Sequence, residues 1–203
     1  MRFIGITGGV GAGKSAILSY LAQKEKTKVL LADEIAHELM QPQTECYARI
    51  LEQFPKEQIL TDGLGSTFDR GKLAQVIFSD DKKRSAINAI VHPAVKEYVR
   101  QQYQLELEKG ELELLVLEAA LLIEEDYDEI CDELWYIYTS EDIRRKRLVE
   151  SRGYSQEKID HIFKSQLSED EFRQSTQVTI DNNGKLEETY RQIEDALRRN
   201  ADE

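Results

Sequence analysis

The sequence has little of what marks disulfide-rich, zinc-binding or membrane proteins. Cysteine occurs only at Cys46 and Cys131, in no Cys-x-x-Cys or Cys/His spacing, so we expect free thiols and neither a disulfide framework nor a zinc site. The longest apolar stretch, 112–123, is interrupted by Glu113 and Glu118 and is shorter than the ~20 residues of a membrane-spanning helix. We therefore expect no membrane partner and interpret this stretch as a buried strand.

The sequence also lacks an excess of basic over acidic residues. The net charge is −12 at pH 7, which disfavours a general nucleic-acid binder because such proteins displace counterions with a basic surface. A small phosphorylated ligand needs only a local basic pocket and stays compatible with this charge. Residues 1–7 lead straight into glycines, without the apolar core or cleavage site of a signal peptide, and we expect a cytoplasmic protein.

Strand-like apolar runs alternate with longer helix-like segments. Because this alternation is typical of parallel sheets covered by helices, we predict an α/β fold with a five-stranded parallel sheet flanked by helices. The chain of 203 residues is long enough for a single domain with inserted subdomains but too short for two enzymatic domains. The five runs lie at 3–7, 28–32, 114–118, 134–139 and 177–180.

The gap between the second and third runs, about 41–112, exceeds what one crossover helix requires. We expect an inserted helical region there, which could carry substrate specificity. Within it, Pro93 lacks an N–H and biases His92 away from helical dihedrals, so we predict that one helix ends near Val91 and another begins with Pro93 in its first turn.

A second, charge-rich insertion is expected at about 141–174. Its pattern predicts a helix, a turn at Gly153 and another helix. A further helix at 185–198 should follow the turn-forming loop 181–184.

Residues 8–15 follow the first strand and match the phosphate-loop pattern G-x-x-x-x-G-K-[ST]. Glycines let the backbone wrap tightly, so that N–H groups and the start of the helix near Gly13 point at phosphate oxygens. Lys14 should reach the terminal phosphates and the Ser15 hydroxyl should ligate Mg²⁺. The alternative is a merely glycine-rich turn. We favour a nucleotide site formed by Gly8, Gly9, Val10, Gly11, Ala12, Gly13, Lys14, Ser15 and Ala16.

Carboxylates follow the second and third predicted strands, where open α/β sheets place their ligands. Asp33 could accept the proton of an attacking hydroxyl or hold Mg²⁺, or it could cap a helix; position alone does not decide. His37 lies one helical turn further on, where a solvated role is the alternative. Glu118 closes the third strand and could lie near the metal, or it could be a buried structural carboxylate.

The second insertion carries several basic residues. Arg147 and Arg152 could fold over the phosphates and neutralise the charge that develops during transfer. The alternative is a solvated, charged helix face, and this is our interpretation for Arg144, Arg145 and Lys146.

Together, these motifs resemble those of the dephospho-CoA kinase family, and the resemblance is co-linear over nearly the whole chain. It includes the phosphate loop and Ala32-Asp33-Glu34-Ile35-Ala36-His37, which matches the family's A-D-x-x-A-H. The later matches are Asp69-Arg70 with Leu73, His92-Pro93, Leu121-Leu122 with Glu124, Arg147 with Arg152, and Ile180-Asp181-Asn182 before Gly184.

The resemblance implies a P-loop kinase that transfers the γ-phosphoryl group of ATP to the ribose 3′-hydroxyl of dephospho-CoA. It implies that Asp33 is the catalytic base, that His37 lies with it at the acceptor, and that Arg70 and His92 mark the region where dephospho-CoA docks. The small-molecule partner is therefore dephospho-CoA, and we favour a monomer over an oligomer.

The resemblance also implies that Arg147 and Arg152 sit in a mobile lid and that Asn182 lies near the adenine of ATP. The sequence departs from the family at two places: the strand-end D-x-P-L-L is replaced by residues 118–122, Glu-Ala-Ala-Leu-Leu, and the usual A-D before the last strand is replaced by Thr-Gln at 176–177.

Two other functions compete with this interpretation. A kinase of another small acceptor, such as a nucleoside monophosphate, would share the phosphate loop. A GTP-dependent switch would use D-x-x-G strings, which occur at 62–65 and 181–184, but the sequence contains no Asn-Lys-x-Asp string for reading guanine.

Overall fold

The computed structural model describes residues 1–55, 59–61 and 67–199, and for Arg70, Phe78 and Ser79 it describes the backbone alone. The chain forms two compact units. The first consists of 1–30 and 106–203, and the second of 31–105. Within the described ranges, no helix is long and apolar enough to cross a membrane.

A five-stranded sheet forms the centre of the first unit, in the order β2-β3-β1-β4-β5. β1 pairs in parallel with β3 and β4, and β4 pairs in parallel with β5. The predicted sheet is confirmed, and each predicted strand end lies within one residue of the observed one. The strands are β1 Arg2–Thr7, β2 Thr27–Leu31, β3 Leu114–Glu118, β4 Glu133–Tyr138 and β5 Val178–Asp181.

The middle residues of the central strands are mostly apolar because both faces of these strands are buried. In β1, Phe3, Ile4 and Ile6 are almost completely inaccessible, and so are Trp135 and Ile137 in β4. The parallel register places the carboxyl ends of the strands at one edge of the sheet.

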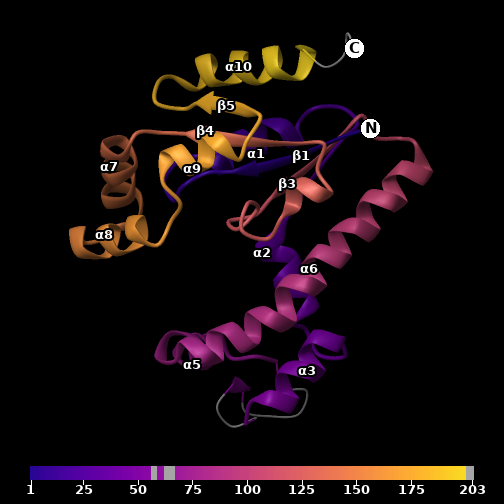
Figure 1. The fold of residues 1–203 in the computed structure, drawn as a ribbon, viewed down its shortest axis with the longest axis vertical. Helices are drawn as coiled ribbons and strands as arrows, with labels where there is room; N and C mark the ends of the chain where they lie inside the picture. The colour runs from indigo at the N-terminus through magenta and orange to yellow at the C-terminus, as the bar shows by residue number, and fades with distance from the viewer. Residues whose placement is uncertain (56–58, 62–66, 200–203) are drawn as a thin grey trace. The chain divides into compact units, whose positions relative to one another are not determined.

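Helices flank the sheet, and α1 and α7 follow the carboxyl ends of β1 and β4 in the chain (Figure 1). α7 follows β4 and ends at Gly153, whose left-handed φ of 62° suits glycine, so the predicted turn is confirmed. The sequence did not predict α9 as a separate helix. The helices of this unit are α1 Lys14–Ala22, α7 Glu141–Arg152, α8 Gln156–Lys164, α9 Glu169–Gln174, α10 Leu186–Arg199 and the 3₁₀ turn η1 Tyr127–Glu129.

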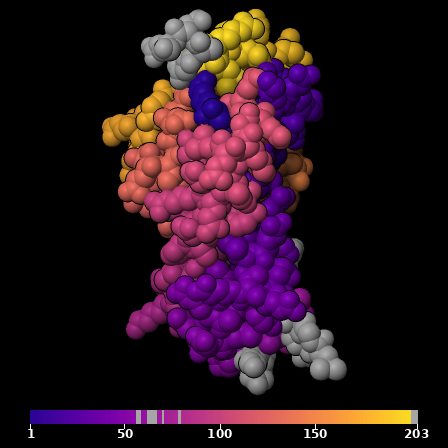
Figure 2. Space-filling model, turned by 90° about the vertical axis from the view of Figure 1, so that its right-hand side faces the viewer, coloured from indigo at the N-terminus to yellow at the C-terminus, as the bar shows by residue number. Residues whose placement is uncertain are grey.

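The last helix packs beside the first strand. In Figure 2 the N-terminal residues, in indigo, lie next to α10, in yellow. Arg2 donates hydrogen bonds to the carbonyls of Ala196 and Leu197 and forms an ion pair with Glu133. Because these carbonyls belong to the last turn of α10, Arg2 satisfies acceptors that the helix itself leaves open.

The second unit is helical. It holds α2 Ala32–Leu39, α3 Glu45–Gln53, α5 Arg70–Ser79 and most of α6 Asp81–Lys109. An isolated antiparallel bridge joins Leu60 and Phe68. Ile35, Ile50 and Ile59 are buried within this unit.

The predicted break at Pro93 is wrong, because α6 runs unbroken from Asp81 to Lys109 with Pro93 inside it. Proline removes one helical hydrogen bond, but a buried stripe opposes that cost. Ile87, Val91, Val95 and Val99 are buried and recur every four residues, so they lie on one face on both sides of the proline. Ending the helix at Val91 would turn part of this stripe out of the core.

Candidate active site

The phosphate loop joins β1 to α1, and its glycines adopt backbone shapes that other residues disfavour. Gly13 has a φ of +90°, and a Cβ built there would lie 2.4 Å from Nδ2 of Asn182. Gly13 has no side chain that could cap α1, and the first turn contains no acidic residue. The N–H groups at the start of α1 are therefore left for an anion.

Side chains hold several carbonyls of the loop by hydrogen bonds. Lys14 Nζ donates to Gly8 O at 2.7 Å. Ala12 O accepts hydrogen bonds from Asn182 Nδ2 at 2.7 Å, from Thr139 Oγ1 at 3.0 Å and from Arg147 Nη1 at 3.3 Å. In a trans peptide the N–H points opposite to the carbonyl, so fixing these oxygens also fixes the direction of the N–H groups that follow them.

Glu118 ends β3 beside the phosphate loop. Its Oε1 lies 3.5 Å from Lys14 Nζ, and the two side chains are only 18% and 16% exposed. Ser15 is exposed in the first turn of α1. The described residues contain no group of three or more His, Cys, Asp or Glu side chains that could hold a metal ion. One carboxylate and one hydroxyl nevertheless fit Mg²⁺, which binds through few protein ligands and completes its shell with phosphates and waters.

Asn182 is buried behind the loop after β5. Besides donating to Ala12 O, it accepts a hydrogen bond at Oδ1 from Thr189 Oγ1 at 3.0 Å. Its backbone carbonyl accepts from Arg147 Nη2 at 2.9 Å. Asn182 and Arg147 thus connect α7, α10 and the phosphate loop in a single hydrogen-bonded cluster.

Arg147 and Arg152, which the sequence paired, have different surroundings. Arg147 contacts the phosphate loop and is partly buried, whereas Arg152 is exposed at the end of α7. A hydrogen bond from Arg152 to Tyr154 lowers the pKa of that tyrosine.

The sequence interpretation was wrong for Arg144 but right for its neighbours. Arg145 forms surface ion pairs with Glu141 and Asp160, and Lys146 is exposed. Arg144 instead packs onto the phosphate loop, where its Nε donates to Val10 O at 3.0 Å. The available signal was spacing: residues 144 and 147 lie three apart and share one helix face, which residues 145 and 146 do not.

The acceptor residues expected from the sequence all belong to the second unit. Asp33 is exposed in the first turn of α2, but the N-cap position is Leu31, so Asp33 is not the cap residue. The alternative prediction, that Asp33 is the N-cap of this helix, is therefore wrong. His92 is half-buried within α6, and the side chain of Arg70 lies outside the described part of the chain.

His37 borders a hollow that the sequence did not predict. The hollow has a volume of about 290 Å³ and lies within the second unit. Gln41 Nε2 donates to the backbone carbonyl of His37 at 3.0 Å. Asp69, part of the matched Asp-Arg pair, caps α5 by accepting from the N–H groups of residues 71 and 72. The hollow is lined by His37, Met40, Gln41, Thr67, Phe68 and Leu73.

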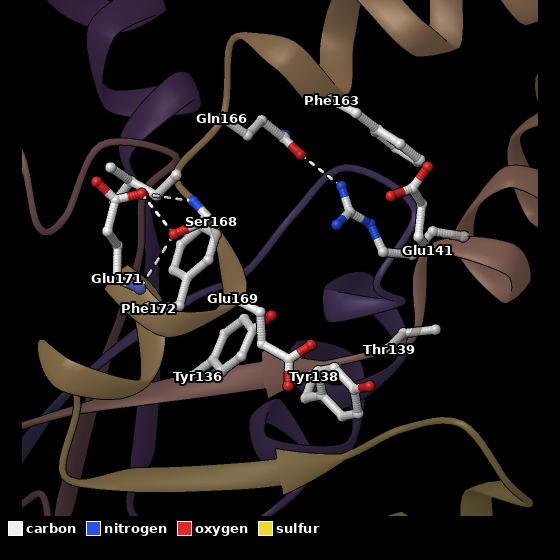
Figure 3. Close-up of a pocket in the computed structure, with 12 residues that line it drawn as sticks. Tyr136, Tyr138, Thr139, Glu141, Phe163, Gln166, Ser168, Glu169, Glu171 and Phe172 are labelled. Carbon is white, nitrogen blue, oxygen red and sulfur yellow. Dashed lines mark hydrogen bonds between the residues drawn. The ribbon is translucent and has the colours of Figure 1, made fainter.

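A second cavity, of about 320 Å³, lies between the carboxyl end of β4 and the helices α7 to α9 in the first unit. Figure 3 shows the rings of Tyr136, Tyr138, Phe163 and Phe172 around it. Tyr136 and Phe172 stack with ring centroids 4.7 Å apart, and burial raises the pKa of Tyr136. The wall is therefore aromatic, with Arg144 as its basic member.

Comparison with known proteins adds an independent finding. A family model described as dephospho-CoA kinase matches residues 2–188. The dephospho-CoA kinase of Shouchella clausii is 34% identical over 200 residues, which cover 98% of this chain and 99% of that protein. The dephospho-CoA kinase of Oceanobacillus iheyensis is 36% identical over 199 residues, covering 97% of this chain and 96% of that protein.

Solved structures agree on the fold. The dephospho-CoA kinase from Campylobacter jejuni superposes with a TM-score of 0.71 at 20% identity, over 98% of this chain and 96% of that one. A shikimate kinase from Acinetobacter baumannii reaches a TM-score of 0.51 at 15% identity, over 98% and 95% of the two chains. At these identities the likeness concerns the fold alone, which is the predicted P-loop kinase fold.

Proposed function

The chain belongs to the dephospho-CoA kinase family, and we propose that it transfers the γ-phosphoryl group of ATP to the ribose 3′-hydroxyl of dephospho-CoA. The products are CoA and ADP, as in the last step of CoA synthesis. The observation that carries the proposal is the geometry of the phosphate loop. Side chains hold the carbonyls of Gly8 and Ala12 by hydrogen bonds, and α1, which follows the loop, has no side-chain cap at its N-terminus.

The phosphates of ATP would be bound by the loop N–H groups and by Lys14. Lys14 already lies between a loop carbonyl and Glu118, so a small change of rotamer would bring its charge to a phosphate oxygen. Ser15 and Glu118 would hold Mg²⁺. When bound, this ion supplies positive charge to the β- and γ-phosphate oxygens.

Asp33 would act on the acceptor. It is exposed and follows the last residue of β2, Leu31, by two positions, which is the usual place for ligand-binding residues in such sheets. As the ribose oxygen forms its bond to the γ-phosphorus, the bond from that phosphorus to the β–γ bridging oxygen breaks. The hydroxyl proton passes to the Asp33 carboxylate, and ADP leaves.

The second unit would provide the docking region for dephospho-CoA. Support comes from the hollow beside His37, which is the right kind of concave, partly apolar surface for a small ligand. Arg70 and His92 are the other residues that we propose for this region, which corresponds to the insertion expected at about 41–112.

Arg147 and Arg152 would belong to the lid, at about 141–174, and would neutralise phosphoryl charge during transfer. Arg147 is close to the loop already, whereas Arg152 would have to approach the phosphates by a movement of α7 or of its own side chain. Asn182 would lie near the adenine, at the back of the phosphate loop.

The competing functions gain no support from a specific observation. The D-x-x-G string at 181–184 forms the end of β5 and a turn, in which Asp181 Oδ1 accepts from the Asn183 N–H. The string at 62–65 lies outside the described residues. A cytoplasmic location and a monomeric state stay predictions.

An assay of ADP release with several acceptors tests the proposal. With ATP and Mg²⁺ present, dephospho-CoA should support turnover far above AMP, CMP, shikimate or water alone. Faster release with AMP or CMP would favour a nucleoside monophosphate kinase, and equal release with water would favour a nucleotide-hydrolysing switch. GTP in place of ATP completes the comparison.

A further inference from the structure

Arg144 makes an unusual set of contacts for a residue on a charged helix. Its Nε donates to Val10 O at 3.0 Å, its Nη2 donates to Gln166 Oε1, and its Cζ lies 4.3 Å from the ring centroid of Phe163. In Figure 3 the dashed line from Gln166 marks the second of these bonds. One guanidinium group thus connects the phosphate loop with α8 and the segment that follows α8.

The guanidinium also lies directly against the backbone of Gly9. A Cβ built on Gly9 would be 2.3 Å from Cζ of Arg144, closer than real Cβ atoms come to any neighbour. A side chain at the second loop position would therefore displace this guanidinium from where it lies. Burial lowers the pKa of Arg144, yet an arginine stays protonated at neutral pH.

The bond to Val10 O fixes the direction of one loop amide. Because the peptide is planar and trans, the Gly11 N–H points away from the carbonyl that Arg144 holds. The Gly11 N–H donates to no group in the part of the chain that the structure describes. It therefore points away from α7 and is available to a ligand. The Gly13 N–H is placed in the same way, because Asn182 holds the Ala12 carbonyl of the same peptide.

We propose that Arg144 is a positioning residue of the phosphate loop: by holding Val10 O, it directs the Gly11 N–H at a phosphate oxygen of the bound nucleotide. This inference rests on the proposed function, because it assumes that the loop binds nucleotide phosphates. Through its contacts with Phe163 and Gln166, the same side chain also links the loop to α8. A movement of α8 would therefore shift Arg144 and the loop carbonyl that it holds.

Titration calorimetry with ADP on three variants tests this role. A hydrogen bond to a charged group contributes ~1.5–3 kcal/mol, so R144A should weaken ADP binding roughly ten- to a hundredfold. R144K keeps the charge and can donate a single bond to Val10 O, and it should recover part of the loss. K146A removes an exposed charge from the same helix and should bind ADP like the unchanged protein.

Steady-state kinetics separate positioning from general damage. R144A should raise the KM for ATP while the KM for dephospho-CoA stays within about twofold, since the second unit is untouched. If R144A melts earlier but binds ADP as tightly as the unchanged protein, Arg144 is only structural and the inference is wrong. If R144A does not fold, R144M, which keeps an apolar stem but cannot donate to Val10 O, takes its place, and ADP binding by R144M less than threefold weaker than that of the unchanged protein overturns the inference. Failure of the unchanged protein to bind ADP would refute the proposed function itself.

Discussion

At the scale of single residues, Asp33 carries the chemical step of the proposal. It is exposed in the first turn of α2, where a negative charge is also favoured by the helix dipole. Replacing it with Asn keeps the size of the side chain but removes the charge and the ability to accept a proton. General-base help is worth ~10²–10⁴ in rate, and phosphoryl transfer uses the low end because its transition state is loose.

We therefore predict that Asp33→Asn lowers kcat about a hundredfold while ATP binding survives, because the phosphate loop is unchanged. Glu34→Gln is the matched control, since Glu34 is an exposed acid in the same turn. Steady-state kcat and an ATP titration on both variants decide the matter. A drop below about fivefold in Asp33→Asn would exclude Asp33 as the base.

Ser15 tests the metal part of the site. Its exposed hydroxyl lies in the first turn of α1, which contains no acidic residue. Ser15→Ala should raise the Mg²⁺ concentration needed for half-maximal activity roughly tenfold, because one ligand of a weakly held ion is lost. Ser19→Ala, a change of the same kind further along α1, should leave the Mg²⁺ titration unaltered. Identical titrations for both variants would argue against Ser15 as a ligand.

The residues of the site differ in how far the sequence reveals them. The phosphate loop could be predicted because its function is encoded in consecutive residues. For Arg144 the spacing from Arg147 was the only signal, because its partners Val10 and Gln166 lie far away in sequence on both sides. Composition shows only an arginine among charged neighbours, and the fold decides that this one faces the loop.

At the scale of elements, the strands were predictable and α6 was not. A buried parallel strand is a continuous apolar run with little ambiguity about its ends. The proline rule, in contrast, considers only the neighbouring backbone, whereas α6 is held by burial on one face from Ile87 to Val99. Packing over three turns outweighs the local preference at His92 and Pro93.

This account of α6 predicts a stabilising substitution. Pro93→Ala restores an N–H that can donate to Ala89 O and removes the ring from the helix interior, a change worth up to ~3 kcal/mol. Alanine also makes the unfolded chain less rigid, and this higher entropy offsets part of the gain. We therefore expect the free energy of unfolding to rise by roughly 1–2 kcal/mol. Urea unfolding followed by circular dichroism measures it. A lower midpoint with an unchanged slope would show that α6 depends on the proline.

At the scale of the whole molecule, the phosphate-handling residues and the acceptor residues belong to different units. Lys14, Glu118 and Arg147 are in the first, and Asp33 and His37 are in the second. The overall charge of −12 does not oppose an anionic substrate, because the half-buried basic side chains of Lys14, Arg144 and Arg147 act locally at the loop.

The central claim is the transfer of the γ-phosphoryl group to one hydroxyl of one acceptor. The most direct test incubates the protein with dephospho-CoA and ATP labelled in the γ-phosphate, and then treats the product with a phosphatase that removes only ribose 3′-phosphates. We predict label in a CoA-sized product, complete release of that label by the phosphatase, and no transfer by Lys14→Ala. Label found only as free phosphate, or in a product that resists the phosphatase, would contradict the account.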